Sequence, residues 1–247
     1  MLSGEVPLVN IAGLAELKEI FEVEGGVSIG SGVCFTDLVK HPLIQQRYPL
    51  LVTACKTVGS LQLRNRATIG GNIVNAAPCA DSMPPLIIYD AEVELRSARG
   101  TRRMPVSEFV VGGYRTLLEP EELVVRFILP APTQQPLINR YLQLGRRNAL
   151  NITRQSLTGQ FMVDKGVVRL CRLVDGALMA KPQRLTEVEQ ALTGKTLDAA
   201  TIDYAAGVLH DKVEKAIGGR WSAPYKVPVF IDMFRQMLQE VMTEQKK

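Results

Sequence analysis

The sequence predicts an α+β protein of two domains, and three observations support this assignment. Both halves of the 247-residue chain contain alternating, strand-like segments and segments with helical spacing, and in the second half the strands precede the helices. Pro130, Pro132 and Pro136 interrupt the chain within a few residues, which is its strongest linker signal. The length suffices for two modest hydrophobic cores. We therefore expect domains at residues 1–132 and 137–247.

Five elements are expected before residue 64. In chain order they are a short strand and a helix within residues 5–17, an alternating strand over 26–33, a helix toward His41 that Thr36 or Asp37 caps, and a helix over 50–63. The last of these places an apolar face toward a core and ends just before a glycine-containing loop.

The remainder of the first domain is expected to hold one helix and two strands. Asp81 is a good N-cap residue, and Pro84 and Pro85 are tolerated in a first helical turn, so a helix is predicted to start there. Strands are expected at residues 91–95 and 123–129, with a basic turn at 98–103 between them.

The second domain is predicted to pair two strands and then form three helices. The strands span residues 158–163 and 167–174 around a hairpin turn, and the helices span 186–192, 198–211 and 229–243. The last helix carries an apolar stripe from Val229 to Val241 at helical spacing. A buried core face explains this stripe, with a partner-docking face as the alternative.

Composition argues against several classes of function. The net charge of +4 is mild and the basic residues are scattered, which disfavours nucleic acid as a partner. The sequence contains neither an apolar run of about 20 residues nor the features of a signal peptide, so we expect a cytoplasmic protein without membrane contact. The four cysteines are widely separated, so no local zinc or iron–sulfur site is expected. No catalytic acid, base or nucleophile is recognised.

Residues 66–81, RATIGGNIVNAAPCAD, form the candidate binding loop. Gly70 and Gly71 lack a Cβ, so the backbone can reach positive φ and its N–H groups can approach a bulky anion. Thr68 adds a hydroxyl donor and Asn72 an amide donor. No lysine or arginine lies within the turn, which favours a diphosphate over the transferable γ-phosphate of a P-loop.

Asp81 would repel a diphosphate, so its carboxylate is expected to accept hydrogen bonds from sugar or ribityl hydroxyls. The simpler alternatives are that Gly70 and Gly71 form an ordinary tight turn and that Asp81 only caps a helix; Asp81 could serve in both roles. A second glycine cluster, Gly30-Ser31-Gly32, lacks the third glycine of the dinucleotide-binding motif G-x-G-x-x-G. A turn after a strand is its expected role.

Residues 63–73, with Ala77, Pro78 and Asp81, resemble the second flavin motif of the FAD-binding subunits of molybdenum hydroxylases, which include xanthine dehydrogenase, aldehyde oxidase and carbon monoxide dehydrogenase. The resemblance implies that FAD is the cofactor. It assigns FAD contacts to Thr68, Ile69, Gly70, Gly71, Asn72 and Asp81. The similar segment at 112–124 implies a further contact through the backbone of Val124.

The same resemblance extends to residues 145–149 and 222–226, landmarks of the family's C-terminal domain. It implies a two-lobed FAD-binding domain followed by a small antiparallel sheet covered by helices. The chain would be an oxidoreductase subunit working with a molybdopterin-binding large subunit and a small subunit that carries two-iron clusters. Its final acceptor would be NAD, oxygen or a quinone. Arg146 and Arg147 form either a docking patch or a solvated surface.

Two features depart from the family pattern. An Ala-Gly-Gly-Thr-Asp-like first flavin motif is expected upstream of residues 9–11 and is not in this sequence, so the predicted FAD-binding domain is incomplete. The family's lysine just after Tyr141 is replaced, since Leu142 and Gln143 stand there. Either a longer protein exists, or the chain is a non-catalytic assembly subunit that has lost flavin.

Overall fold

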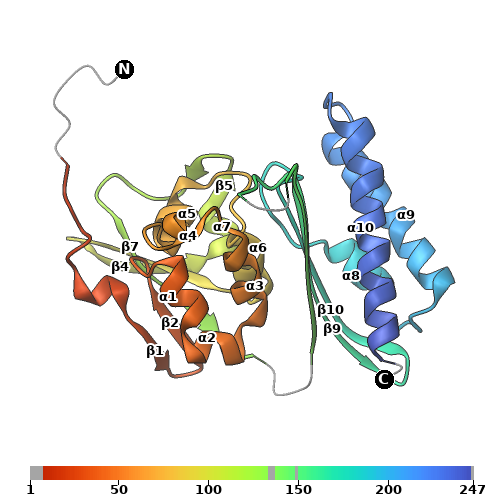
Figure 1. Ribbon diagram of the computed structural model, residues 1–247, viewed down its shortest axis with the longest axis horizontal. Helices are drawn as coiled ribbons and strands as arrows, with labels where there is room; N and C mark the ends of the chain where they lie inside the picture. Colours follow the sequence, from red (N-terminus) through yellow and green to blue (C-terminus); the bar gives the residue numbers. More distant parts are fainter. Residues whose placement is uncertain (1–7, 133–136, 148–149, 246–247) are drawn as a thin grey trace.

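The structure is a computed structural model that describes residues 8–132, 137–147 and 150–245 (Figure 1). It confirms the α+β class. A mixed first half is followed by an antiparallel sheet, and helices cover the far face of that sheet (Figure 1). Pro136 lies outside the described residues, so its part in the predicted linker has no structural description.

The first half is built around a five-stranded antiparallel sheet in the order β1-β2-β7-β3-β4. β2 is buried at every position, whereas the edge strand β4 is largely exposed, so the core follows the centre of the sheet. The strands are β1 (Ile20–Val23), β2 (Gly26–Gly30), β3 (Glu92–Ser97), β4 (Gly100–Pro105) and β7 (Leu123–Pro130).

Short helices pack on this sheet and bury its apolar residues, except for the helix at Leu61–Arg64, which has no buried residue. They are η1 (Ala15–Lys18), α1 (Phe35–Lys40), α2 (Pro42–Arg47), α3 (Pro49–Thr57), α4 (Leu61–Arg64), α5 (Ile69–Asn75), α6 (Met83–Ile88) and α7 (Val106–Phe109), and a small ladder pairs β5 (Val110–Gly112) with β6 (Arg115–Thr116). Tyr48 and Tyr89 meet edge to face at 5.1 Å between ring centroids, inside this first core.

The second half forms a three-stranded antiparallel sheet in the order β10-β9-β8. Its strands are β8 (Ile138–Leu144), β9 (Gln155–Asp164) and β10 (Val167–Gly176), and its helices are α8 (Thr186–Leu192), α9 (Ala199–Ile217) and α10 (Ala223–Glu244). The helices cover one face of the sheet, while α3 and α6 of the first half contact the other (Figure 1). Val174 of β10 belongs to the first core, so this sheet lies between both cores.

Several predicted elements of the first half are wrong in detail. No strand forms at residues 8–11, where Leu8 is 94% exposed, because this segment has no neighbouring strand. The helix at 50–63 divides into α3 and α4 at Gly59, whose φ of +47° is left-handed. Thr36 and Asp37 lie inside α1, which begins after Cys34. Most of the expected basic turn at 98–103 is strand, since β4 pairs with β3.

The second half follows the sequence more closely. The hairpin is confirmed, with Lys165 and Gly166 at φ values of 49° and 80°, and so is the helix at 186–192. α9 and α10 are longer than expected, since α10 begins six positions before residue 229 and includes Pro228. The apolar stripe of α10 is core, with Phe230 and Phe234 fully buried. Strand β8 was not predicted from the sequence.

Candidate functional site

The glycine loop enters helix α5 through Thr68. Thr68 is the N-cap residue, and its Oγ1 accepts a hydrogen bond from the Gly71 N–H at 3.0 Å. The backbone N–H of Ile69 donates to the Val33 carbonyl at 3.1 Å, and that of Gly70 donates to the Ser31 carbonyl at 2.9 Å. The loop is therefore fastened to the segment that follows β2.

Gly70 and Gly71 have different structural roles. A Cβ on Gly70 would lie 2.6 Å from the Cβ and the carbonyl oxygen of Ser31, so close packing excludes any side chain there. A Cβ on Gly71 would meet only the Thr68 hydroxyl, at 3.2 Å, and Gly71 is exposed. Neither glycine has a positive φ. The positive φ that glycine permits is therefore not used here, because both residues lie in the first turn of α5.

The donors of the turn that remain without a partner among the described residues are on side chains. The N–H groups of residues 69–71 already donate within the protein, which corrects the expectation that free backbone amides form an anion cradle. Thr68 accepts through Oγ1 and keeps its hydroxyl proton for donation. Asn72 Oδ1 accepts from the fully buried Ser82 hydroxyl at 2.6 Å, which leaves the Nδ2 amide as a donor.

Asp81 is not a helix cap. Ser82 occupies the N-cap position of α6, while Asp81 Oδ1 accepts hydrogen bonds from Thr153 Oγ1 at 2.6 Å and from the Tyr141 hydroxyl at 3.1 Å. Gln143 Nε2 donates in turn to Thr153 Oγ1 at 2.5 Å. Asp81 is 7% exposed, and its Oδ2 receives no hydrogen bond from the described residues. The carboxylate thus keeps one free acceptor.

Burial raises the pKa of Asp81 above its usual range, and the hydrogen bonds from Thr153 and Tyr141 oppose that rise. Burial and the nearby Asp81 charge likewise raise the pKa of Tyr141, so its phenol stays protonated and acts as a donor. The site therefore holds a carboxylate whose charge depends on hydroxyl donors from the second half of the chain.

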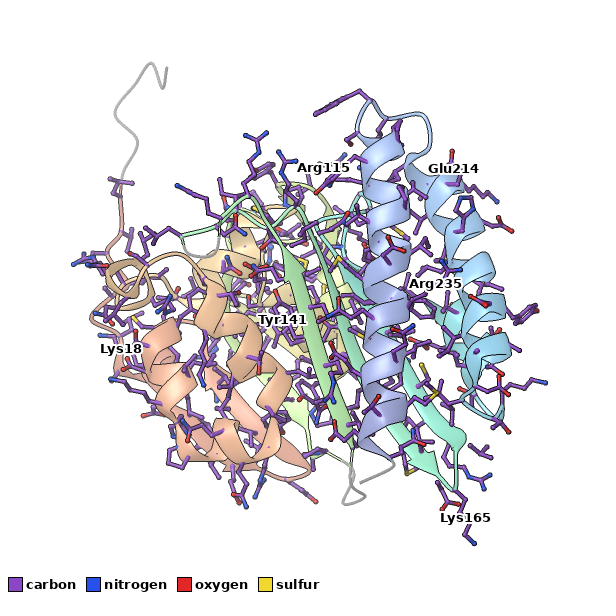
Figure 2. The ribbon with its side chains drawn as sticks, turned by 45° about the vertical axis from the view of Figure 1, so that its right-hand side comes forward. Lys18, Arg115, Tyr141, Lys165, Glu214 and Arg235 are labelled. Carbon is purple, nitrogen blue, oxygen red and sulfur yellow. The ribbon has the colours of Figure 1, made fainter. Side chains whose placement is uncertain are left out.

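Tyr141, Gln143 and Thr153 were not identified as site residues from the sequence. Tyr141 and Gln143 lie on β8, in which every residue is half-buried, so the strand shows no clear alternation that would signal it. Figure 2 shows Tyr141 in the middle of the molecule, between the helices of the first half and α10. The site is assembled where the two halves meet.

A cleft of about 730 Å³ opens beside this network. Its lining joins the end of α3 and α4 to the end of β8 and the residues after it: Lys56, Thr57, Gly59, Ser60, Leu61, Gln62, Arg64, Gln143, Leu144, Gly145, Arg147, Leu150 and Asn151. None of these residues is acidic. An adjoining hollow of about 510 Å³ is lined by Arg146, Arg147, Asn151, Ile152 and Arg154. Asn148 and Ala149 lie outside the described residues.

Val124 lies apart from the cleft lining. It is 3% exposed on β7, opposite Leu95 of β3. The next residue, Val125, accepts the Ser31 N–H through its carbonyl at 2.9 Å. Val124 is therefore the sequence neighbour of the residue that binds Ser31, and Ser31 in turn binds the glycine loop. Within the described part of the chain, no cluster of three or more His, Cys, Asp or Glu could hold a metal ion, and no helix is long and apolar enough to cross a membrane.

Two family models match the chain. The model described as the FAD binding domain in molybdopterin dehydrogenase matches residues 5–132, and the CO dehydrogenase flavoprotein C-terminal domain matches residues 141–241. The first match covers more than half of the chain and contains the glycine loop and Asp81.

Individual relatives agree with both models. The chain is 30% identical to the xanthine dehydrogenase FAD-binding subunit of Escherichia coli O157:H7, over 95% of this chain and 81% of that protein. It is also 30% identical to the nicotinate dehydrogenase FAD-subunit of Eubacterium barkeri, over 96% of this chain and 81% of that protein. A carbon monoxide dehydrogenase structure from Hydrogenophaga pseudoflava superimposes with a TM-score of 0.81 at 30% identity, over 90% of this chain and 76% of that one. The chain belongs to the family of FAD-binding medium subunits of the molybdopterin-dependent dehydrogenases, the molybdenum hydroxylases.

Proposed function

We propose that this chain holds FAD and passes electrons between iron–sulfur clusters of a small subunit and an external acceptor, beside a molybdopterin-binding large subunit. FAD supplies the redox chemistry, since it takes up electrons singly and releases them in pairs. The observation that carries the proposal is Asp81, a buried carboxylate fixed by two hydroxyl donors, within a chain segment that matches an FAD-binding domain.

The residues present fit such a cofactor. Thr68 and Asn72 each keep a donor for diphosphate oxygens, and exposed Gly71 lets a ligand approach the turn closely. Asp81 Oδ2 is suited to accept from a ribityl hydroxyl. Ile69 and Gly70 position the turn through Val33 and Ser31. Val124 completes the proposed FAD-binding residues.

We propose NAD as the external acceptor. The cleft lining carries the cations Lys56, Arg64 and Arg147 and no carboxylate, which favours a phosphate-bearing molecule over a neutral one. We place the complex in the cytoplasm, a proposal supported by the four free thiols, which suit a reducing compartment.

We also propose domains at residues 1–132 and 137–247. Support comes from the two separate clusters of buried side chains, one containing Phe35 and Phe127 and the other containing Phe161 and Phe230. The Asp81 network and Val174 join these two units.

A second function has its own supporting observation. The amides of residues 69–71 already donate within the protein, an arrangement that a flavin-free structural subunit would also show. The absorbance spectrum of the purified chain, after incubation with FAD and gel filtration, separates the two functions. We expect flavin bands that elute with the protein. A spectrum without them would favour the structural role for this 247-residue chain.

A further inference from the structure

The arginines of the chain differ in how their charge is balanced. Many pair with carboxylates, as Arg47 does with Glu22 and Arg102 with Glu122. Arg146, Arg147, Arg154 and Arg220 form no ion pair with any described residue, although they lie close together in the second half.

These arginines share one surface. Arg146, Arg147 and Arg154 line the hollow of about 510 Å³, whose other lining residues are Asn151 and Ile152. Lys226 of α10 donates through Nζ to the Arg154 carbonyl at 2.8 Å, which ties the start of α10 to this hollow. Arg147 also lines the cleft proposed for NAD, so we call Arg146, Arg154, Arg220 and Lys226 the basic face.

The positive charges around Lys226 on the basic face repel one another. The pKa of Lys226 is lowered, first by burial and then by the positive charges of Arg220 and Arg154. No acidic group contributes to the shift at Lys226. An anionic surface placed here would relieve the repulsion, so the basic face is complementary to carboxylates.

Apolar side chains beside the basic face distinguish its partner from a small anion. Trp221 is 93% exposed, Ile152 is 70% exposed and Tyr225 is 47% exposed. Trp221 follows Arg220 and Tyr225 precedes Lys226 in sequence, and Ile152 shares the hollow with Arg154. Trp, Tyr and Arg are the residues most enriched at the centres of protein interfaces. An inorganic phosphate has no apolar surface that could pack against this exposed indole.

We infer that the basic face, together with Trp221, docks onto a neighbouring protein subunit that presents carboxylates around an apolar socket for the indole. This inference rests on the proposed function, because it takes the neighbour to be another subunit of the dehydrogenase complex. Beyond that function, the inference identifies the basic face and Trp221 as the docking surface, and it identifies carboxylates and an apolar socket as the chemistry of the partner's surface.

The test uses the intact complex, isolated through an affinity tag on this chain after expression in its native host. We compare Trp221→Ser and the double variant Arg146→Glu/Arg154→Glu with the parent. Arg169→Glu is the matched control, since Arg169 is also exposed but pairs with Asp164 beside the β9–β10 turn. The measured quantities are recovery of the molybdenum and iron–sulfur subunits at increasing salt, the melting temperature of each isolated chain, and its FAD content.

We expect both test variants to reduce subunit recovery about tenfold or more, with melting temperature and FAD content at parental values. The control should retain its partners. Equal recovery of all variants at every salt concentration would overturn the docking surface while leaving the proposed function standing. A parent chain that carries FAD but isolates without molybdenum or iron–sulfur subunits would overturn the proposed complex, and the docking surface with it.

Discussion

The Tyr141 hydroxyl donates a hydrogen bond to Asp81 Oδ1 at 3.1 Å, across 60 positions of the chain. Tyr141 lies on β8 of the second half, whereas Asp81 precedes α6 of the first half. The orientation of the proposed ribityl-binding carboxylate therefore depends on how the two halves pack. Cofactor binding and association of the halves should be coupled through this contact.

Replacing Asp81 with Asn should weaken FAD binding more than it lowers stability. The amide oxygen can still accept from Tyr141 and Thr153, but Nδ2 replaces the acceptor proposed for the ligand. We expect affinity to fall about tenfold or more, measured by flavin fluorescence titration. The flavin-free protein should melt within a few degrees of the parent. A larger loss of stability than of affinity would assign Asp81 a purely structural role.

Thr153→Val should make FAD binding more sensitive to acid. Burial raises the Asp81 pKa and the Thr153 hydrogen bond opposes that rise, so removing the hydroxyl raises the pKa further. A carboxyl is protonated below its pKa, so affinity should begin to fall at a higher pH in Thr153→Val than in the parent. Thr153→Ser keeps the hydroxyl and is the control. The same pH profile for all three proteins would show that Thr153 does not act through Asp81.

Alanine at the two loop glycines should separate packing from binding. Gly70→Ala places a Cβ 2.6 Å from Ser31 and should destabilise the protein by about 1 to 3 kcal/mol. Gly71→Ala meets only the Thr68 hydroxyl, so stability should stay within about 1 kcal/mol of the parent while FAD binding weakens. Urea unfolding and FAD titration measure the two effects. Full FAD retention by Gly71→Ala would remove Gly71 from the proposed contacts.

Stability should decrease as the pH rises from about 4 to about 7, partly because of Asp175. This fully buried carboxyl accepts the backbone N–H groups of Met179 and Gln183, and burial raises its pKa to about 7. The folded state therefore binds the proton more tightly than the unfolded state, so the associated stability is fully present below the unfolded pKa and is lost as the pH approaches 7. Each pKa unit corresponds to about 1.4 kcal/mol, so the effect amounts to a few kcal/mol.

Asp175→Asn isolates this contribution, because the amide does not titrate. Urea unfolding at several pH values should give the variant a flatter profile between pH 4 and pH 7. Asp81, whose pKa is also raised, should leave part of the slope in place. An unchanged slope in Asp175→Asn would show that Asp175 is ionised throughout this range.

Local patterns determined those parts of the fold that depend on neighbours in sequence. The turn at Lys165 and Gly166 and the helix at Thr186–Leu192 follow from turn chemistry and apolar spacing within a few residues. The string around Thr68–Asn72 likewise sufficed for the family resemblance, because its residue types and spacing are contiguous. The sequence pattern did not predict the first turns of α10, because Pro228 lies within the helix and proline normally ends a helix.

Only the tertiary structure decided what these residues contact. Asp81 is a good N-cap by residue type, but packing of the two halves places Tyr141 and Thr153 against its carboxylate, 60 and 72 positions away. Gly70 is required because Ser31 lies against it, a contact that no local pattern encodes. The sequence by itself determined the family and the loop. The hydrogen-bond partners, and hence the charge of Asp81, required the folded chain, because burial and long-range contacts depend on the path of the whole backbone.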